Sequence, residues 1–318
     1  MKKIASLFLL LFLYAGLIIV IAQSKPKVAF TLNEEGLIPE GMTYDPLTRN
    51  FYVGSIAKRK ILRINAKGEV SFFVESNRDR LGEVLGMAIN PRTRTLWACS
   101  NLKTDSSNYS AVHVFDLETG ATVKKYFFEH PRKSHLFNDI CILSSNDVYI
   151  TDSDGSGLYK IEAGSDSIRR LTLSQNITLP NGITASADEK SLYISSSTVL
   201  GIVKVDLKSM NAKGLGTSRL YPGILDGIYF KDGEIIGIQN VFFPEVIAQY
   251  KLDAAGDSIV KETVLAIAHP LFSTPTTGAI VDDEFYFIAN SNVHLFENGK
   301  LKYDGTLGPV YIMKVKWK

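Results

Sequence analysis

The sequence predicts an all-β fold, a six-bladed β-propeller, from two repeated patterns and one unpaired strand. The first pattern is a short cluster of one residue, then Gly or Asp, then an apolar residue, and its second position recurs every 43 to 53 residues. Four-stranded propeller blades have a period of about 40 to 50 residues. The six clusters are Glu40-Gly41-Met42, Leu85-Gly86-Met87, Asn138-Asp139-Ile140, Asn181-Gly182-Ile183, Asp226-Gly227-Ile228 and Thr277-Gly278-Ala279.

The second pattern is a pair of strand-like runs after each cluster. The second run of each unit lies at 51–53, 96–98, 148–150, 192–194, 235–238 and 285–288, and the third at 61–64, 112–115, 158–161, 202–205, 247–250 and 310–313. The third runs alternate in polarity with period two, as half-buried strands do. Each unit therefore predicts antiparallel strands, of which the cluster begins the innermost.

The unpaired strand lies at the other end of the chain. The sixth unit reaches Lys318 before any fourth strand can form, whereas the run 27–32 precedes the first cluster and belongs to no unit. Pairing this N-terminal strand onto the outside of the last blade would close the ring and remove exposed sheet edges. We therefore expect residues 27–318 to form one six-bladed propeller.

The first 22 residues differ from the rest. Lys2 and Lys3 precede an apolar stretch of 19 residues from Ile4 to Ala22, which ends in small and apolar residues. This pattern is typical of a secretory signal peptide. The stretch is also long enough to remain as an N-terminal membrane anchor. Both readings predict an exported protein, periplasmic or extracellular, whose only membrane contact is this segment.

Composition fits a folded domain, with 45% apolar residues, 21% charged residues and a formal net charge of +2. The only basic run, Lys58-Arg59-Lys60, falls at a turn and reads as a solvated surface, so no nucleic-acid partner is predicted. Export permits a disulfide between Cys99 and Cys141, although isolated strand cysteines usually act as small buried groups.

The first positions of the six clusters share one phase of the repeat, so we expect them to converge at one level of the central channel. They are Glu40, Leu85, Asn138, Asn181, Asp226 and Thr277. Two carboxylates and two amides suit Ca²⁺ or another hard divalent cation, whereas zinc prefers imidazole or thiolate. The alternative is that these are ordinary turn residues. That alternative explains the glycines but not Glu40, which is a poor turn former.

The phrases Pro39-Glu40-Gly41, Phe137-Asn138-Asp139, Pro180-Asn181-Gly182 and Leu225-Asp226-Gly227 resemble the senescence marker protein/gluconolactonase family, which is related to diisopropyl fluorophosphatase and the paraoxonases. The resemblance implies that Glu40, Asn138, Asn181 and Asp226 hold a catalytic calcium at the channel mouth. It also implies hydrolysis of a small-molecule lactone or related ester, with Asp226 as general base and Asn138 as a second catalytic residue. Asp139 is expected to orient Asn138.

Two departures from the family pattern bear on the substrate. Leu85 stands where paraoxonases carry a His, and Leu136 stands where animal gluconolactonases carry a sugar-binding Arg. Both favour a less polar substrate. Loops at 101–110, 239–245 and 290–308 should surround the site, with Phe242, Phe243 and His294 as candidates to reach it.

Two other functions remain open at this stage. The cluster and second-strand phrasing also resembles NHL repeats, which imply a non-catalytic binding module. Strictosidine synthase has a similar architecture but lacks the four oxygen ligands. The asymmetric set of Glu40, Asn138, Asn181 and Asp226 favours the hydrolase over both, because a binding repeat does not require four oxygen ligands at one level.

Overall fold

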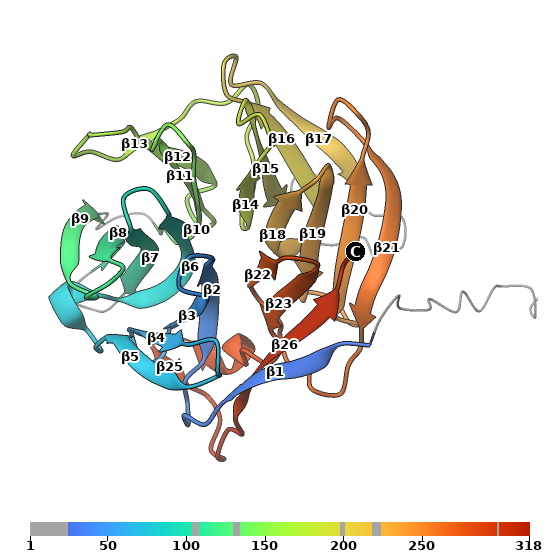
Figure 1. Cartoon of the computed structure of the whole chain (residues 1–318). Coiled ribbons are helices and arrows are strands. Elements are labelled where there is room, and N and C mark those ends of the chain that lie inside the picture. The colour runs from blue at the N-terminus through green and yellow to red at the C-terminus, as the bar shows by residue number, and fades with distance from the viewer. Residues whose placement is uncertain (1–24, 104–107, 130–133, 198–200, 218–223, 298) are drawn as a thin grey trace, which may run out of the picture.

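The computed structural model describes residues 25–318 apart from 104–107, 130–133, 198–200, 218–223 and 298. Six four-stranded antiparallel sheets stand in a ring around a central channel (Figure 1). The six-bladed propeller predicted from the sequence is therefore confirmed. The leader predicted at 1–22 lies outside the described residues. No helix within the described ranges is both long and apolar enough to cross a membrane.

The first three blades each contain four strands that are consecutive in the chain. Blade one comprises β2 (Pro39–Asp45), β3 (Asn50–Ser55), β4 (Lys60–Ile64) and β5 (Val70–Val74). Blade two comprises β6 (Glu83–Asn90), β7 (Thr95–Lys103), β8 (Asn108–Asp116) and β9 (Thr122–Glu129). Blade three comprises β10 (Phe137–Ile142), β11 (Val148–Asp152), β12 (Gly157–Ile161) and β13 (Arg169–Arg170).

Blades four and five follow the same order, and blade six closes the ring. Blade four comprises β14 (Ile183–Ala185), β15 (Ser191–Ser196), β16 (Gly201–Asp206) and β17 (Ala212–Thr217). Blade five comprises β18 (Leu225–Lys231), β19 (Glu234–Gln239), β20 (Val246–Leu252) and β21 (Ile259–Ile267). Blade six comprises β22 (Gly278–Val281), β23 (Glu284–Ile288), β26 (Val310–Lys316) and β1 (Lys27–Leu32).

Ring closure occurs as the sequence predicts, because β1 pairs antiparallel with β26 on the outside of blade six. The loop between β23 and β26 was not predicted to contain structure. It holds a 3₁₀ turn, η2 (Val293–Leu295), and a small hairpin of β24 (Phe296–Glu297) and β25 (Lys300–Leu301). A further 3₁₀ turn, η1 (Arg78–Arg80), links blades one and two.

The core consists of apolar clusters between neighbouring blades. Between blades six and one, for example, Met42 and Val53 pack with Ile288 and Ile312. Apolar side chains on both faces of each sheet are therefore removed from water, which supplies most of the driving force for folding. Cys99 and Cys141 are both free thiols, so the structure contains no disulfide between them.

A β-bulge sets the direction of the site residues. The register of the innermost pair of strands shifts at the same place in blades one, two, three and five. The two residues inside each bulge are the first two positions of the cluster, for example Glu40-Gly41 in blade one and Asp226-Gly227 in blade five. Bulged residues are left out of the ladder and can be redirected, so in these four blades the first position of the cluster turns toward the channel.

The second position of these clusters is glycine because a side chain there would clash with the neighbouring blade. A Cβ on Gly41 would lie 1.9 Å from the backbone oxygen of Leu85, and one on Gly182 would lie 2.3 Å from that of Asp226. Each glycine therefore lets the innermost strand of one blade approach the first cluster position of the next. Close packing of neighbouring blades therefore explains why glycine occupies these positions. The turn preference considered above is not needed to explain it.

Candidate metal centre

The four predicted ligands come together at one end of the channel. Glu40, Asn138, Asn181 and Asp226 all line a single cavity of about 490 Å³. They come from four different blades, on β2, on β10, just before β14 and on β18. Because each occupies the same phase of its blade, their side chains reach the same level.

In blade six, the residue at the level of the candidate ligands is Thr276, whereas the sequence predicted Thr277. Thr276 lines the cavity with the four candidate ligands, while Thr277 lines the opposite part of the channel. The backbone agrees, since Gly227 N–H donates to Thr276 O just as Gly182 N–H donates to Asp226 O. The sequence assignment in blade six was therefore wrong by one residue.

Three of the candidate ligands are almost fully buried. Glu40 is 6% exposed, Asn138 is 7% exposed and Asp226 is 8% exposed. Two of their oxygens, Glu40 Oε2 and Asp226 Oδ1, are buried without a hydrogen-bond partner among the described residues. A buried carboxylate oxygen without a partner is costly, so both atoms are suited to bind a cation or a hydrogen-bond donor.

The electrostatics of these carboxylates are unusual. Burial, together with the neighbouring carboxylates of Asp226 and Asp139, raises the pKa of Glu40 well above its usual range. Burial also raises the pKa of Asp226 to about 7, although a hydrogen bond from Asn240 opposes the shift. Two buried acids that repel each other favour a bound cation, because a cation would stabilise both ionised forms.

Two residues that the sequence analysis missed position the ligands. Asn138 Nδ2 donates to Ser153 Oγ at 2.9 Å, and Ser153 Oγ in turn donates to Pro180 O at 2.6 Å. Asn240 Nδ2 donates to Asp226 Oδ2 at 2.6 Å and to Pro275 O at 2.7 Å. These contacts fix the free oxygens of Asn138 and Asp226 toward the cavity.

A sequence signal for these positioning residues does exist. A small polar residue occurs within two residues of the end of the second strand in every blade, and its side chain forms a hydrogen bond with the backbone of a neighbouring segment. The residues are Ser55, Asn101, Ser153, Ser196, Asn240 and Asn290. In an antiparallel pair this position lies beside the start of the first strand, where the site is built.

Asp139 has a different role from the one expected. Its Oδ2 accepts from Ile183 N–H at 3.0 Å and its Oδ1 accepts from Ile140 N–H at 2.8 Å. Asp139 therefore ties β10 to β14 beneath the site, and Ser153 orients Asn138 instead. Burial raises the pKa of Asp139 to about 6, against these two hydrogen bonds.

The remaining walls of the cavity combine apolar and charged side chains. They are formed by Ile56, Leu85, Leu136, Val293 and Phe296, while Glu83, Lys103, Asp154 and Glu297 add charged groups. The unpredicted η2 and β24 segments of blade six thus supply one wall.

The predicted loop candidates do not line the cavity. His294 is exposed, and its Nδ1 lies 2.7 Å from Thr274 Oγ1. Phe242 and Phe243 are 50% and 88% exposed. Neither the histidine nor the phenylalanine pair is among the cavity residues. Of this blade-five loop, Asn240 is the residue that contacts a candidate ligand.

The donor set is rich in oxygen and mixed in kind. Across the described ranges, no group of three or more His, Cys, Asp or Glu side chains is arranged to hold a metal. The candidate ligands are two carboxylates and two amides, so they differ from such a group in including Asn138 and Asn181. Their oxygens match the hard ligands that Ca²⁺ prefers.

Comparisons with known proteins agree with this architecture. The model of the SMP-30/gluconolactonase/LRE-like region matches residues 38–234, which include Glu40, Asn138, Asn181 and Asp226. A search of curated protein sequences finds no significant match.

Solved structures of the same fold have diverse activities. A gluconolactonase from Xanthomonas campestris is 14% identical with a TM-score of 0.63, and the match covers 93% of this chain and 97% of that one. Regucalcin, a calcium-binding protein from Agrobacterium tumefaciens, is 16% identical with a TM-score of 0.61 over 92% and 96%. A PQQ-bound aldose sugar dehydrogenase from Streptomyces coelicolor is 15% identical with a TM-score of 0.63 over 93% and 99%. At these identities the likeness establishes the fold alone.

Proposed function

Because the chain belongs to the SMP-30/gluconolactonase/LRE-like family, we propose that it is a calcium-dependent hydrolase of a lactone or related ester. Family membership supports a lactonase-type hydrolase. The structural neighbours also include a dehydrogenase, so the fold does not fix the activity and the site residues must decide it.

One observation carries the proposal. Two buried carboxylate oxygens, Glu40 Oε2 and Asp226 Oδ1, face one cavity without a hydrogen-bond partner among the described residues. The amide groups of Asn138 and Asn181 complete a set of hard oxygen donors in the same cavity. Calcium takes six to eight oxygens in flexible geometry, so four protein ligands leave positions for water and substrate. The residues present fit this ion.

The ion, when bound, would polarise the substrate carbonyl and stabilise the oxyanion that forms on attack by water. Asn138 has its Nδ2 committed to Ser153, so its Oδ1 is the atom available as a ligand. Asp226 has Oδ2 held by Asn240, which leaves Oδ1 for the ion. The family resemblance also assigns to Asp226 the proton transfer from water, although a carboxylate beside a cation is a weak base.

The walls indicate the kind of substrate. Leu85, Leu136 and Phe296 present apolar surface to the cavity, and by the family resemblance Leu136 stands in place of a sugar-binding Arg. We therefore expect a lactone or ester with an aliphatic or aromatic part, and weaker turnover of sugar lactones. The apolar leader at 1–22 supports a site of action outside the cytoplasm, in the periplasm or beyond.

The test is hydrolysis of a lactone panel, from sugar-derived to long-chain aliphatic, with calcium and after chelation. Asp226→Asn is the site variant, and Asp232→Asn is its matched control because Asp232 is exposed in the same blade. We expect turnover that is lost on chelation and in Asp226→Asn but kept in Asp232→Asn. If calcium binds and no lactone or aryl ester is hydrolysed, a non-catalytic binding propeller replaces the hydrolase.

A further inference from the structure

The cavity contains six titratable side chains among the described residues, and most of them are unsuited to act as the base. They are Glu40, Glu83, Lys103, Asp154, Asp226 and Glu297. Glu40 and Asp226 are the carboxylates proposed to bind calcium, and a bound cation makes a carboxylate a weak base. A base outside the ligand set is therefore needed for efficient proton transfer.

Three of the remaining four side chains are exposed and belong to the outer edge of the cavity. Asp154 accepts a hydrogen bond from Ser134, and Glu297 forms an ion pair with Lys302. Lys103 is an exposed cation and has no lone pair to accept a proton at neutral pH. Glu83 is left as the carboxylate that is neither a proposed ligand nor exposed.

Glu83 is held in place by the sheet. It begins β6 and pairs with Asn101 of β7. Val84 is buried against the core beneath Gly54, while Leu85 lies on the cavity side. Leu85 lies inside the bulge of β6, whereas Glu83 lies before it in the regular ladder. Both residues line the cavity.

The Glu83 carboxylate has no hydrogen bond or ion pair to any other described residue. Burial raises its pKa, and the positive charge of Arg59, in the turn before β4, lowers it only in part. The other charged groups around it are Lys103 on the paired strand β7 and Glu40 on β2, which packs against β6. A half-buried, unpartnered carboxylate in an apolar wall is a stronger base than an exposed one.

We infer that Glu83 is the general base of the proposed hydrolysis and that Asp226 serves as a ligand. This inference rests on the proposed function. In the reaction, the water oxygen forms a bond to the carbonyl carbon, its proton passes to the Glu83 carboxylate, and the carbonyl electron pair moves onto oxygen. When the tetrahedral oxyanion collapses, the bond from carbon to the ring oxygen breaks and Glu83 returns the proton to that oxygen. One lactone and one water give one hydroxy acid, and Glu83 is regenerated.

The experiment compares Glu83→Gln and Glu83→Ala with a control, Glu118→Gln, which replaces an exposed glutamate in the β8–β9 turn of the same blade. Glu83→Gln should lower kcat about 10²- to 10⁴-fold, leave KM and the calcium-induced rise in Tm unchanged, and remove the acidic limb of the pH profile. Formate should restore part of the kcat of Glu83→Ala, because a small carboxylate can take the vacated space. Glu118→Gln should behave as the unaltered protein.

Separate results distinguish the two proposals. An unaltered protein that hydrolyses no substrate overturns the hydrolase and the base assignment together. Hydrolysis by the unaltered protein with kcat retained in Glu83→Gln, or with its acidic limb intact, overturns the role of Glu83 alone. If Glu83→Ala is folded and calcium-responsive but formate has no effect on its lowered kcat, Glu83 has a structural role and the inference is wrong.

Discussion

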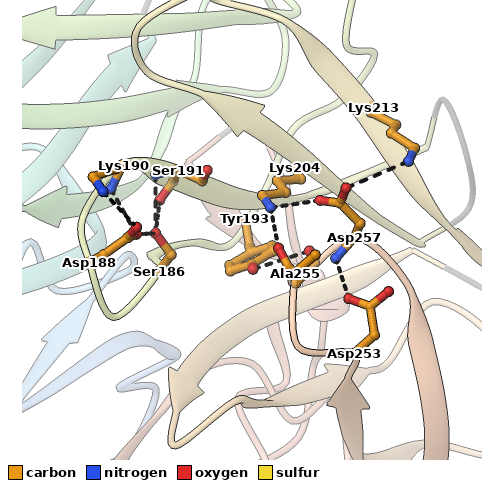
Figure 2. Close-up of polar contacts among 11 residues, drawn as sticks. Ser186, Asp188, Lys190, Ser191, Tyr193, Lys204, Lys213, Asp253, Ala255 and Asp257 are labelled. Carbon is orange, nitrogen blue, oxygen red and sulfur yellow. Dashed lines mark hydrogen bonds and ion pairs between the residues drawn. The ribbon is translucent and has the colours of Figure 1, made fainter.

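The candidate metal centre and the outer contact between blades four and five use charged side chains in opposite ways. In the outer contact, Lys204 Nζ donates to Ala255 O at 2.7 Å and lies 2.7 Å from Asp257 Oδ1, as Figure 2 shows. Tyr193 Oη donates to Gly256 O at 3.2 Å beside it. Each of these polar groups has a partner, and together they fasten β15 and β16 to the turn after β20.

The candidate metal centre contains carboxylates of the same kind, but two of their oxygens have no partner among the described residues. The outer contacts stabilise the folded propeller, whereas the buried carboxylates of Glu40 and Asp226 destabilise it unless a cation is bound. Unpaired buried charge that persists in a folded protein is typical of a functional site. The difference between the two regions therefore separates the residues kept for stability from those kept for chemistry.

Removal of one inner carboxylate is the strongest test of this difference. Glu40→Gln should lower calcium-dependent hydrolysis about 10²- to 10³-fold, since the charge that would hold the ion in place is lost. The same variant should be more stable than the unaltered protein in a chelator, by about 1 to 3 kcal/mol, because a buried carboxylate without a partner is removed. Urea unfolding in the chelator measures the second effect. A Glu40→Gln protein that is less stable in the chelator would show that Glu40 stabilises the ring as the outer charges do.

Calcium itself should stabilise the folded state. At a free concentration of 100 times its Kd, the ion should add about 2.7 kcal/mol, since it binds the folded chain and not the unfolded one. Thermal unfolding with and without calcium measures the effect, and Glu40→Gln serves as the control that should respond weakly. Equal responses in the two proteins would place the calcium at some other site.

The Asp45–Arg94 pair between blades one and two contains a carboxylate whose pKa is lowered, whereas the pKa of Asp226 is raised. Arg94 donates to both oxygens of Asp45, at 2.8 and 2.7 Å. Burial raises the pKa of Asp45, but the hydrogen bonds from Arg94 and Thr48 outweigh it and lower the pKa to about 2. The pKa of an aspartate is thus lowered where it is paired with an arginine and raised at the candidate metal centre.

This shift predicts a pH dependence of stability. The folded-state pKa of Asp45 lies below its unfolded value, so its contribution of about 2 kcal/mol is complete above about pH 4 and is lost as pH falls toward 2. Urea unfolding between pH 5 and pH 2.5 measures the loss. In Arg94→Met the curve should start lower and fall less over this range. A parallel curve for the variant would mean that Asp45 gains nothing from Arg94.

The sequence predicted the parts of the structure that depend on local pattern. The strands, the ring closure by β1 and the convergence of four oxygen-bearing side chains follow from a period and a phase, both of which are visible in one chain. The error at Thr277 has a physical cause. Gly278 resembles the glycines of the other clusters, but a Cβ there would lie 2.3 Å from Tyr286 O in its own blade. Gly278 therefore avoids a clash within blade six and not a clash with the next blade. Aligning the blade-six cluster on this glycine placed the ring position at Thr277, one residue after Thr276.

The contacts that the sequence did not predict join distant parts of the chain. Ser153 and Asn240 hold ligands through hydrogen bonds whose other partners, Pro180 and Pro275, lie in the next blades. No periodicity specifies which of several polar residues at a strand end will reach across. The wall formed by η2 and β24 was missed because two-residue strands leave no alternating pattern.

The smallest predicted effect concerns the outer contact itself. Lys204→Met should lower the free energy of unfolding by about 1 kcal/mol, since it removes donors to Ala255 O and Asp257 while keeping most of the aliphatic side chain. Lys190→Met is the matched control in Figure 2, because Lys190 is exposed and lies 3.6 Å from a single carboxylate, Asp188. Urea unfolding should separate the two variants, while the calcium-induced rise in Tm stays the same in both. A weaker calcium response in Lys204→Met would mean that the outer contact also shapes the metal centre, and the division between stabilising and functional charges would fail at this blade.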